Sequence, residues 1–177
     1  MAIKPIQGTK KVLFFQAMDD TTVDGNSLRL AFQTEHTLTM EREELEEITK
    51  DGTLKDTGDI NASIDLTAYV ASGDATYDLL KRSFKANETL QVWEVDVTEE
   101  TTSGKYEAVY AQGKLTNFEQ SSSADGYAEL STTIAVNLTP QDGEVSLTPD
   151  EFTAVQYAFK DFGELASEAE GDTTTQE

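Results

Sequence analysis

The sequence predicts a mainly β domain whose antiparallel strands form a sandwich or barrel, with one flanking α-helix and a short C-terminal helix. Apolar and polar residues alternate with a period of two in several segments, most clearly over 60–70 and 130–138, as in strands with one buried face. Turn-forming sequences separate these segments, so consecutive strands should pair as hairpins. A sandwich or barrel covers the apolar faces of such sheets.

Other segments carry weaker strand patterns, and about six or seven strands are expected in all. The weaker candidates are 11–17, 28–40, 90–97 and 106–118. Turn signals lie between the periodic segments, at 24–26, 51–52, 103–104, 121–126 and 142–143. The Asp-Gly pairs among them supply the positive φ that tight hairpins need.

A period of 3.6 residues marks one helix over 74–86. Asp74 is suited to cap its N-terminus, while Tyr77, Leu80 and Phe84 fall on one apolar stripe. The helix dipole favours cations near the C-terminal end, and three occur there: Lys81, Arg82 and Lys85. The segment is therefore expected to be a short helix packed on a sheet.

A second helix is expected from Thr148, with Pro149 at its first position and Glu151 completing a capping box. Gly163 would end it. The chain beyond that point is acidic and has no Lys or Arg, a composition typical of disorder. Residues 1–162 are thus assigned to one domain, and 163–177 to an acidic, disordered C-terminal tail.

Residues 41–59 lie between two good strand candidates and carry a block of charge. A connection of this length exceeds the ~2 to 5 residues of an ordinary hairpin loop, and long loops tend to be functional or disordered. We therefore expect a long functional loop here. A short helix over 43–48 is the alternative local structure.

The charge balance excludes several classes of function. The 177 residues include 34 Asp and Glu against 13 Lys and Arg, a formal net charge of −21. Tight nucleic-acid binding and attachment to an anionic membrane both depend on Lys and Arg, so neither is expected. No apolar run approaches the ~18 residues needed to span a bilayer, and the N-terminus lacks a signal-peptide pattern. The chain is expected to be soluble and cytoplasmic when made.

Motifs for catalysis, cofactor binding or metal binding are absent from the sequence. It contains no Cys and a single histidine, His36, which is too few for a zinc site or a His-based triad. Nucleophile-elbow, phosphate-loop, dinucleotide and calcium-loop patterns do not occur. No catalytic, cofactor-binding or metal residues are therefore predicted. A strand-rich acidic domain with unpaired edges is instead typical of a subunit that assembles with its own copies.

The sequence resembles the major tail proteins, or tail tube proteins, of long non-contractile phage tails, especially those of siphophages that infect Gram-positive bacteria. The likeness extends to about residue 162. It rests on the order and spacing of IQGTKKVL at 6–13, TKDG at 49–52, the helix at 74–86, QGKLTNFE at 112–119 and AVQYAFK at 154–160.

This resemblance implies a tail tube fold whose copies form hexameric rings that stack into a tube. It further implies a structural virion protein, assembled in the host cytoplasm, with a tape measure protein and tail terminator and tip proteins as partners. DNA would pass through the lumen without specific binding, because an acidic or neutral lining repels phosphates.

Two sets of residues are candidates for roles in such a tube. The polar faces of the strands are predicted to line the lumen, with the side chains of Gln33, Glu35, Asn61, Ser63, Asp65 and Thr67. The alternative is that these faces are an outer surface in contact with solvent. The long loop is expected to reach the neighbouring ring through Glu43, Glu44, Glu46, Lys50 and Asp51. Its basic partners there would be Lys81, Arg82 and Lys85.

Other classes remain open at this stage. An extracellular β-sandwich binding module would need an exposed aromatic cluster, yet the only tryptophan, Trp93, sits in a core-like strand. An acidic-site glycosidase would need paired carboxylates in a cleft, which sequence does not reveal. The tube protein of a bacterial injection machine is a related structural alternative.

Overall fold

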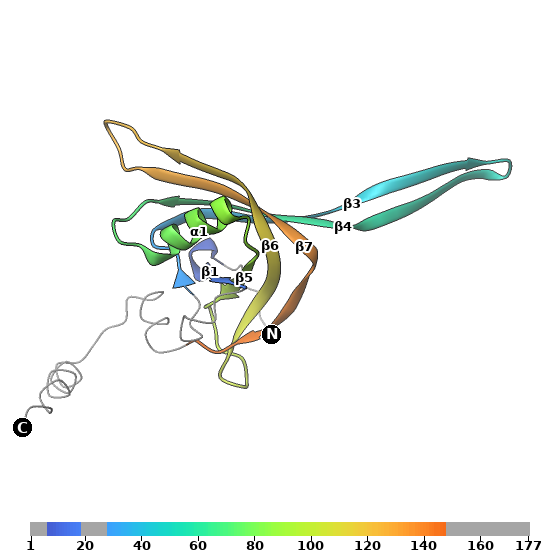
Figure 1. Ribbon diagram of the computed structural model, residues 1–177. Helices are drawn as coiled ribbons and strands as arrows, with labels where there is room; N and C mark the ends of the chain where they lie inside the picture. The colour runs from blue at the N-terminus through green and yellow to red at the C-terminus, as the bar shows by residue number, and fades with distance from the viewer. Residues whose placement is uncertain (1–6, 19–27, 148–177) are drawn as a thin grey trace, which may run out of the picture. The chain divides into compact units, whose positions relative to one another are not determined.

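The computed structural model describes residues 7–18 and 28–147. In this part of the chain, seven antiparallel strands form one sheet in the order β2-β1-β5-β6-β7-β4-β3, and one helix follows β4 (Figure 1). The elements are a 3-10 turn at Gly8–Lys10, β1 Lys11–Ala17, β2 Leu28–Arg29, β3 Gln33–Thr49, β4 Gly52–Tyr69, α1 Ala75–Ala86, β5 Leu90–Asp96, β6 Tyr106–Ser121 and β7 Glu129–Val145. The expected C-terminal helix and the boundary at 162 and 163 lie outside the described residues.

The sheet curves around a hydrophobic core. Leu13 of β1, Leu66 of β4 and Ile134 of β7 are all buried in it. Because β1 and β4 lie near opposite ends of the strand order, their side chains meet only if the two halves of the sheet face each other. This is a barrel-like arrangement, and the prediction of a mainly β antiparallel fold with one flanking helix is confirmed.

Helix α1 forms where its sequence predicts. The Asp74 carboxylate accepts hydrogen bonds from the backbone N–H groups of Thr76 and Tyr77, at 2.8 and 3.3 Å, and so caps the first turn. Leu80 is fully buried. The rings of Tyr77 and Phe84 both pack on Phe118 of β6, with centroids 6.0 and 5.9 Å away. The apolar stripe therefore holds the helix on the sheet.

The segment 41–59 is a β-hairpin, so the expectation of a long loop there was wrong, and so was the alternative of a short helix over 43–48. β3 and β4 pair from the body of the protein to a two-residue turn at Lys50 and Asp51, with one register shift in this segment, between Arg42 and Glu44. Every residue of 41–59 except Gly58 is exposed, so both faces of the ladder lie in solvent. A strand with no buried face has no reason to alternate apolar and polar residues, which is why its pattern was not visible.

Two smaller boundaries also differ from the prediction. The expected strand 28–40 is broken after Arg29, because Phe32 adopts the left-handed backbone conformation with φ of 51°. The expected turn at 142–143 lies inside β7, where Gly143 pairs with Ala108 of β6. β7 bends instead at Leu138, whose φ is 60°, and continues along β6.

Candidate functional site

Four neighbouring strands, β3, β4, β7 and β6, carry a continuous polar face opposite the core. Residues that pair directly across an antiparallel ladder point to the same side. Glu35 pairs with Thr67, and Asp65 pairs with Thr133, which in turn pairs with Asn117. The face so defined comprises, with Ala135 between them, the polar residues Glu35, Thr37, Thr39, Glu41, Asn61, Ser63, Asp65, Thr67, Glu129, Ser131, Thr133, Lys114, Asn117, Glu119 and Ser121. We call this set the polar face.

The polar face is anionic. It carries one cation, Lys114, against five carboxylates, which come from Glu35, Glu41, Asp65, Glu119 and Glu129. The Thr133 hydroxyl donates a 2.6 Å hydrogen bond to Asp65 and orients that carboxylate. Lys114, at the rim of this region, already donates to the backbone carbonyl of Asn87 at 2.9 Å. The surface therefore offers hydroxyls, amides and carboxylates but little to hold a phosphate.

Five of the six residues predicted to line the lumen lie together on the polar face: Glu35, Asn61, Ser63, Asp65 and Thr67. Gln33 does not, and its assignment to that set is corrected. A register shift between Gln33 and Glu35 places Gln33 opposite Ala68, a buried residue of the core face. One irregular residue in a strand moves the next side chain to the other face, and sequence alternation alone misses such a shift.

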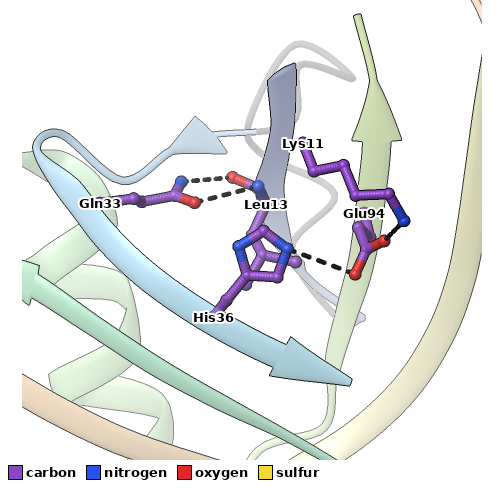
Figure 2. Close-up of polar contacts among 5 residues, drawn as sticks. All are labelled: Lys11, Leu13, Gln33, His36 and Glu94. Atoms are coloured by element: carbon purple, nitrogen blue, oxygen red, sulfur yellow. Dashed lines mark hydrogen bonds and ion pairs between the residues drawn. The ribbon is translucent and has the colours of Figure 1, made fainter. Parts of the chain in front are cut away.

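Gln33 instead helps to close the barrel. Its amide nitrogen donates to the Leu13 carbonyl at 2.8 Å, and its amide oxygen accepts from the Leu13 N–H at 3.0 Å. Figure 2 shows this side chain reaching from β3 to β1. β2 pairs with β1 only at Phe14 and Phe15. At Leu13, the Gln33 amide therefore makes the two backbone hydrogen bonds that a neighbouring strand would otherwise make. The two ends of the sheet are thus joined by a side chain.

A buried carboxylate makes a second connection between β3 and the strands β1 and β5. We call the line along which β3 meets these strands the seam. Glu94 of β5 is 8% exposed, and its two oxygens contact Lys11 at 2.5 Å and His36 at 3.3 Å (Figure 2). The hydrogen bond from His36 and the charge of Lys11 outweigh burial and lower the pKa of Glu94 to about 2. The single histidine of the chain is therefore part of an ion-pair network that ties β3 to β1 and β5.

The hairpin of residues 41–59, which we call the arm, is exposed and carries its own ion pair. Lys55 lies 2.5 Å from Glu44 and 3.9 Å from Glu46, on one face of the ladder. At the turn, the Thr49 hydroxyl donates to the Gly52 carbonyl at 2.7 Å. Glu44 and Glu46, which were predicted to contact basic residues of a neighbouring ring, are therefore already close to Lys55 of the same arm.

The predicted basic partners lie on α1 and are exposed. The Lys81 amine sits 5.5 Å from the centre of the Tyr77 ring, and Arg82 is 3.6 Å from Glu88. Lys85 is in the last turn of the helix. α1 packs on β6, β1 and β2, and within one chain the structure does not bring these cations to the arm.

Some functional residues were missed by the sequence reasoning. The contributions of β6 and β7 to the polar face, such as Asn117 and Thr133, follow from the alternation at 130–138, but only the register shows that they adjoin β4. The network of Lys11, His36 and Glu94 joins residues far apart in the chain and has no local signal.

The described residues carry neither a membrane-spanning helix nor a cluster of metal ligands. No helix in 7–18 or 28–147 is long and apolar enough to cross a membrane. The same residues contain no group of three His, Asp or Glu side chains placed to hold a metal ion.

Comparison with known proteins places the chain among tube proteins. A family model described as phage tail tube protein matches residues 5–142. The tail tube protein gp17.1* of Bacillus phage SPP1 is 29% identical over 170 residues, which span 94% of this chain and 64% of the SPP1 protein. The chain thus spans slightly less than two thirds of that relative's length.

Solved structures share the fold. The SPP1 tail tube, determined by solid-state NMR and cryo-EM, superposes with a TM-score of 0.74 at 22% identity, covering 88% of this chain and 91% of the other. The tail of an empty gene transfer agent particle, refined with C6 symmetry, gives a TM-score of 0.59 at 15% identity, covering 77% of this chain and 98% of the other. A curved antiparallel sheet with one flanking helix is therefore common to all three.

Proposed function

This chain belongs to the phage tail tube protein family, and from that premise we propose that its copies form hexameric rings that stack into the tube of a phage tail. The polar face formed by β3, β4, β7 and β6 is the observation that carries the proposal. The six-fold symmetry of the related gene transfer agent tail supports rings of six. The chain is then a structural component of the virion and not an enzyme.

The part of the sheet that carries the polar face, strands β3, β4, β7 and β6, is suited to line a channel. Its edge strand β3 has no partner beyond it in the described sheet, and an unpaired edge invites pairing with another chain. Closing copies of the sheet into one barrel would remove these edges, and the face opposite the core would then surround the lumen. Carboxylates and hydroxyls on that face repel or ignore phosphates, so DNA slides past without being held.

The arm is suited to join one copy to the next. It extends beyond the rest of the described fold (Figure 1) and buries neither of its faces there. The pairing of its residues Glu43, Glu44, Glu46, Lys50 and Asp51 with Lys81, Arg82 and Lys85 of a neighbour stays a prediction. The tape measure, terminator and tip proteins are the other partners that this proposal includes.

Electron microscopy of the purified chain tests the assembly. We expect concentrated protein to form rings or tubes in negative stain. A variant in which residues 45–56 are replaced by Asn-Gly keeps Glu44 opposite Thr57 and should fold as a monomer. It should form no tubes. Tubes from the shortened variant would remove the arm from the proposal, and failure of the unaltered chain to form rings or tubes would refute assembly itself.

The lumen assignment is tested separately, in phage particles. Glu35→Lys combined with Asp65→Lys adds cations to the polar face and should leave tubes intact but slow DNA ejection, since each ring would then attract the phosphate backbone. Glu99→Lys combined with Glu107→Lys makes the same change in net charge elsewhere on the exposed surface. Equal ejection rates for the two double variants would place the polar face outside the channel.

A further inference from the structure

Three aromatic side chains are exposed together at the end of the sheet opposite the arm. Phe32 is 66% exposed, Tyr69 is 40% exposed and Tyr127 is 80% exposed. The Tyr69 N–H donates to the Phe32 carbonyl at 3.1 Å, and the Tyr69 and Tyr127 rings lie 5.7 Å apart. We call these three residues the end patch. Adjacent exposed aromatics of this kind mark interaction sites more often than isolated ones.

Phe32 is also strained. Its φ of 51° lies in the left-handed region, which bulky side chains rarely adopt. Glycine would adopt that conformation without strain. The Phe32 ring is largely exposed, so its burial contributes little stability to offset the backbone strain. A strained residue that does not serve the core is typical of a functional position.

The tip of the arm has complementary chemistry. It exposes aliphatic side chains on both faces of the ladder: Leu45 and Leu54 on one, and Ile48, which is 84% exposed, on the other. The end patch lies where β3 begins and β4 ends, whereas the tip lies at the far end of the same two strands (Figure 1). The two surfaces therefore do not meet within one chain. Two different complementary surfaces at opposite ends of a subunit form a contact that repeats without closing.

Charge favours the same pairing. Lys50 stands at the turn of the arm, between the exposed Ile48 and Leu54. Glu129 lies directly opposite Tyr69 in the β4 and β7 ladder, beside the aromatic rings. A cation in the tip and a carboxylate in the patch fix the orientation of an otherwise apolar contact.

We propose that the end patch receives the arm tip of a second copy of this chain, so that aliphatic side chains of one subunit pack on Phe32, Tyr69 and Tyr127 of the next. This inference rests on the proposed function, because it names the surface that accepts the arm in the stacked tube. It is an alternative to the prediction that Lys81, Arg82 and Lys85 receive the arm, because it places the acceptor of the arm tip on the aromatic patch.

Disulfide cross-linking tests the contact directly, because the chain has no cysteine of its own. Under mild oxidation during assembly, Ile48→Cys combined with Tyr127→Cys should give a ladder of dimers, trimers and larger products on a non-reducing gel. Each single variant should give no species beyond a dimer. Ile48→Cys combined with Lys81→Cys is the matched control, and it should give no ladder.

The outcomes separate this inference from the proposed function. Tubes in the microscope without a ladder from the Ile48 and Tyr127 pair would overturn the inference and leave the assembly intact, and a ladder from the Lys81 control would place the acceptor on the helix. The end patch would then face another protein, such as one that fills the lumen. Absence of rings and tubes from every variant would refute the assembly and the inference with it.

A second variant probes the patch without new cysteines. Phe32→Gly removes the ring and relieves the backbone strain, so the monomer should be at least as stable as the unaltered chain. We expect the critical concentration for tube formation to rise at least about tenfold. Leu138→Gly is the matched control, because Leu138 is also an exposed apolar residue with a left-handed backbone, at φ of 60°, and lies outside the end patch; it should leave the critical concentration within about twofold. Unchanged assembly of Phe32→Gly would contradict the inference.

Discussion

The body of the protein and its arm are built from the same two strands, yet they follow opposite rules. Between 62 and 68, alternate residues of β4 are buried in the core, whereas from 52 to 57 the same strand is exposed at every position. A hairpin without a buried face is marginally stable in water. The arm therefore contributes little to the fold of one chain, and the comparison shows that its side chains are left available for the contacts between chains that we propose.

The division predicts which substitutions destabilise the monomer and which disturb only assembly. Those in the body should lower the free energy of unfolding in proportion to the contacts they remove. Those in the arm should leave it nearly unchanged. The following predictions test this difference, in order of their expected effect on the stability of the monomer.

Truncation of a core aromatic should have the largest effect. Phe15 of β1 is fully buried, and Phe15→Ala leaves a cavity beneath the helix and the opposite half of the sheet. We expect a loss of about 3–5 kcal/mol in the free energy of unfolding. Urea denaturation followed by tryptophan fluorescence of Trp93 measures it. A loss below about 1 kcal/mol would show that the two halves of the sheet do not share one core.

Removal of the seam carboxylate should have the next largest effect. Glu94→Gln breaks the ion pair with Lys11 and weakens the hydrogen bond with His36, for an expected cost of about 1.5–3 kcal/mol at neutral pH.

The pH dependence of stability checks the cause. The pKa of Glu94 is lowered from 4.5 to about 2, so its contribution is fully present above pH 4.5 and is lost as the pH falls toward 2. Urea midpoints measured across that range should therefore converge for Glu94→Gln and the unaltered chain. If the two curves of urea midpoint against pH stayed parallel, the ionised Glu94 carboxylate would not be the source of the stability that the substitution removes.

Loss of the helix cap should cost less. Asp74 accepts the N–H groups of Thr76 and Tyr77, and its other oxygen accepts the Ala31 N–H at 2.8 Å. Asp74→Ala should lower the free energy of unfolding by about 0.5–2 kcal/mol, and Asp74→Asn by less, since an amide oxygen still caps a helix. Equal losses for the two substitutions, measured by thermal unfolding, would argue against capping as the reason.

A change in the arm should have the smallest effect on the monomer. Leu54→Ser replaces an exposed side chain and should alter the free energy of unfolding by no more than about 0.5 kcal/mol. The same substitution should raise the concentration needed for tube formation, which sedimentation measures. A clear loss in the free energy of unfolding would contradict the proposal that the arm, unlike the body, contributes little to the stability of the monomer.

The sequence was most informative where one face of an element is buried. The strand 11–17 and the helix starting after Asp74 were predicted at the residues where the structure has them. Burial imposes a period on the side chains, and that period is readable without coordinates. The arm lacks such a period because neither of its faces is buried, so the same reasoning mistook it for a loop.

The candidate site followed the same rule. Alternation in 60–70 placed Asn61, Ser63, Asp65 and Thr67 on one polar face, which the register confirms as a shared face. Gln33 was predicted to lie on the same face, but a register shift between Gln33 and Glu35 places it on the core side.

Composition, charge and alternation by themselves determined that this is an acidic, mainly β chain with polar strand faces, because these properties depend only on local residue types. Strand order, the register across β6 and β7, and the meeting of Lys11, His36 and Glu94 were decided by tertiary structure alone. They depend on which distant segments pair when the sheet curves and closes, and that choice is made by the packing of the core.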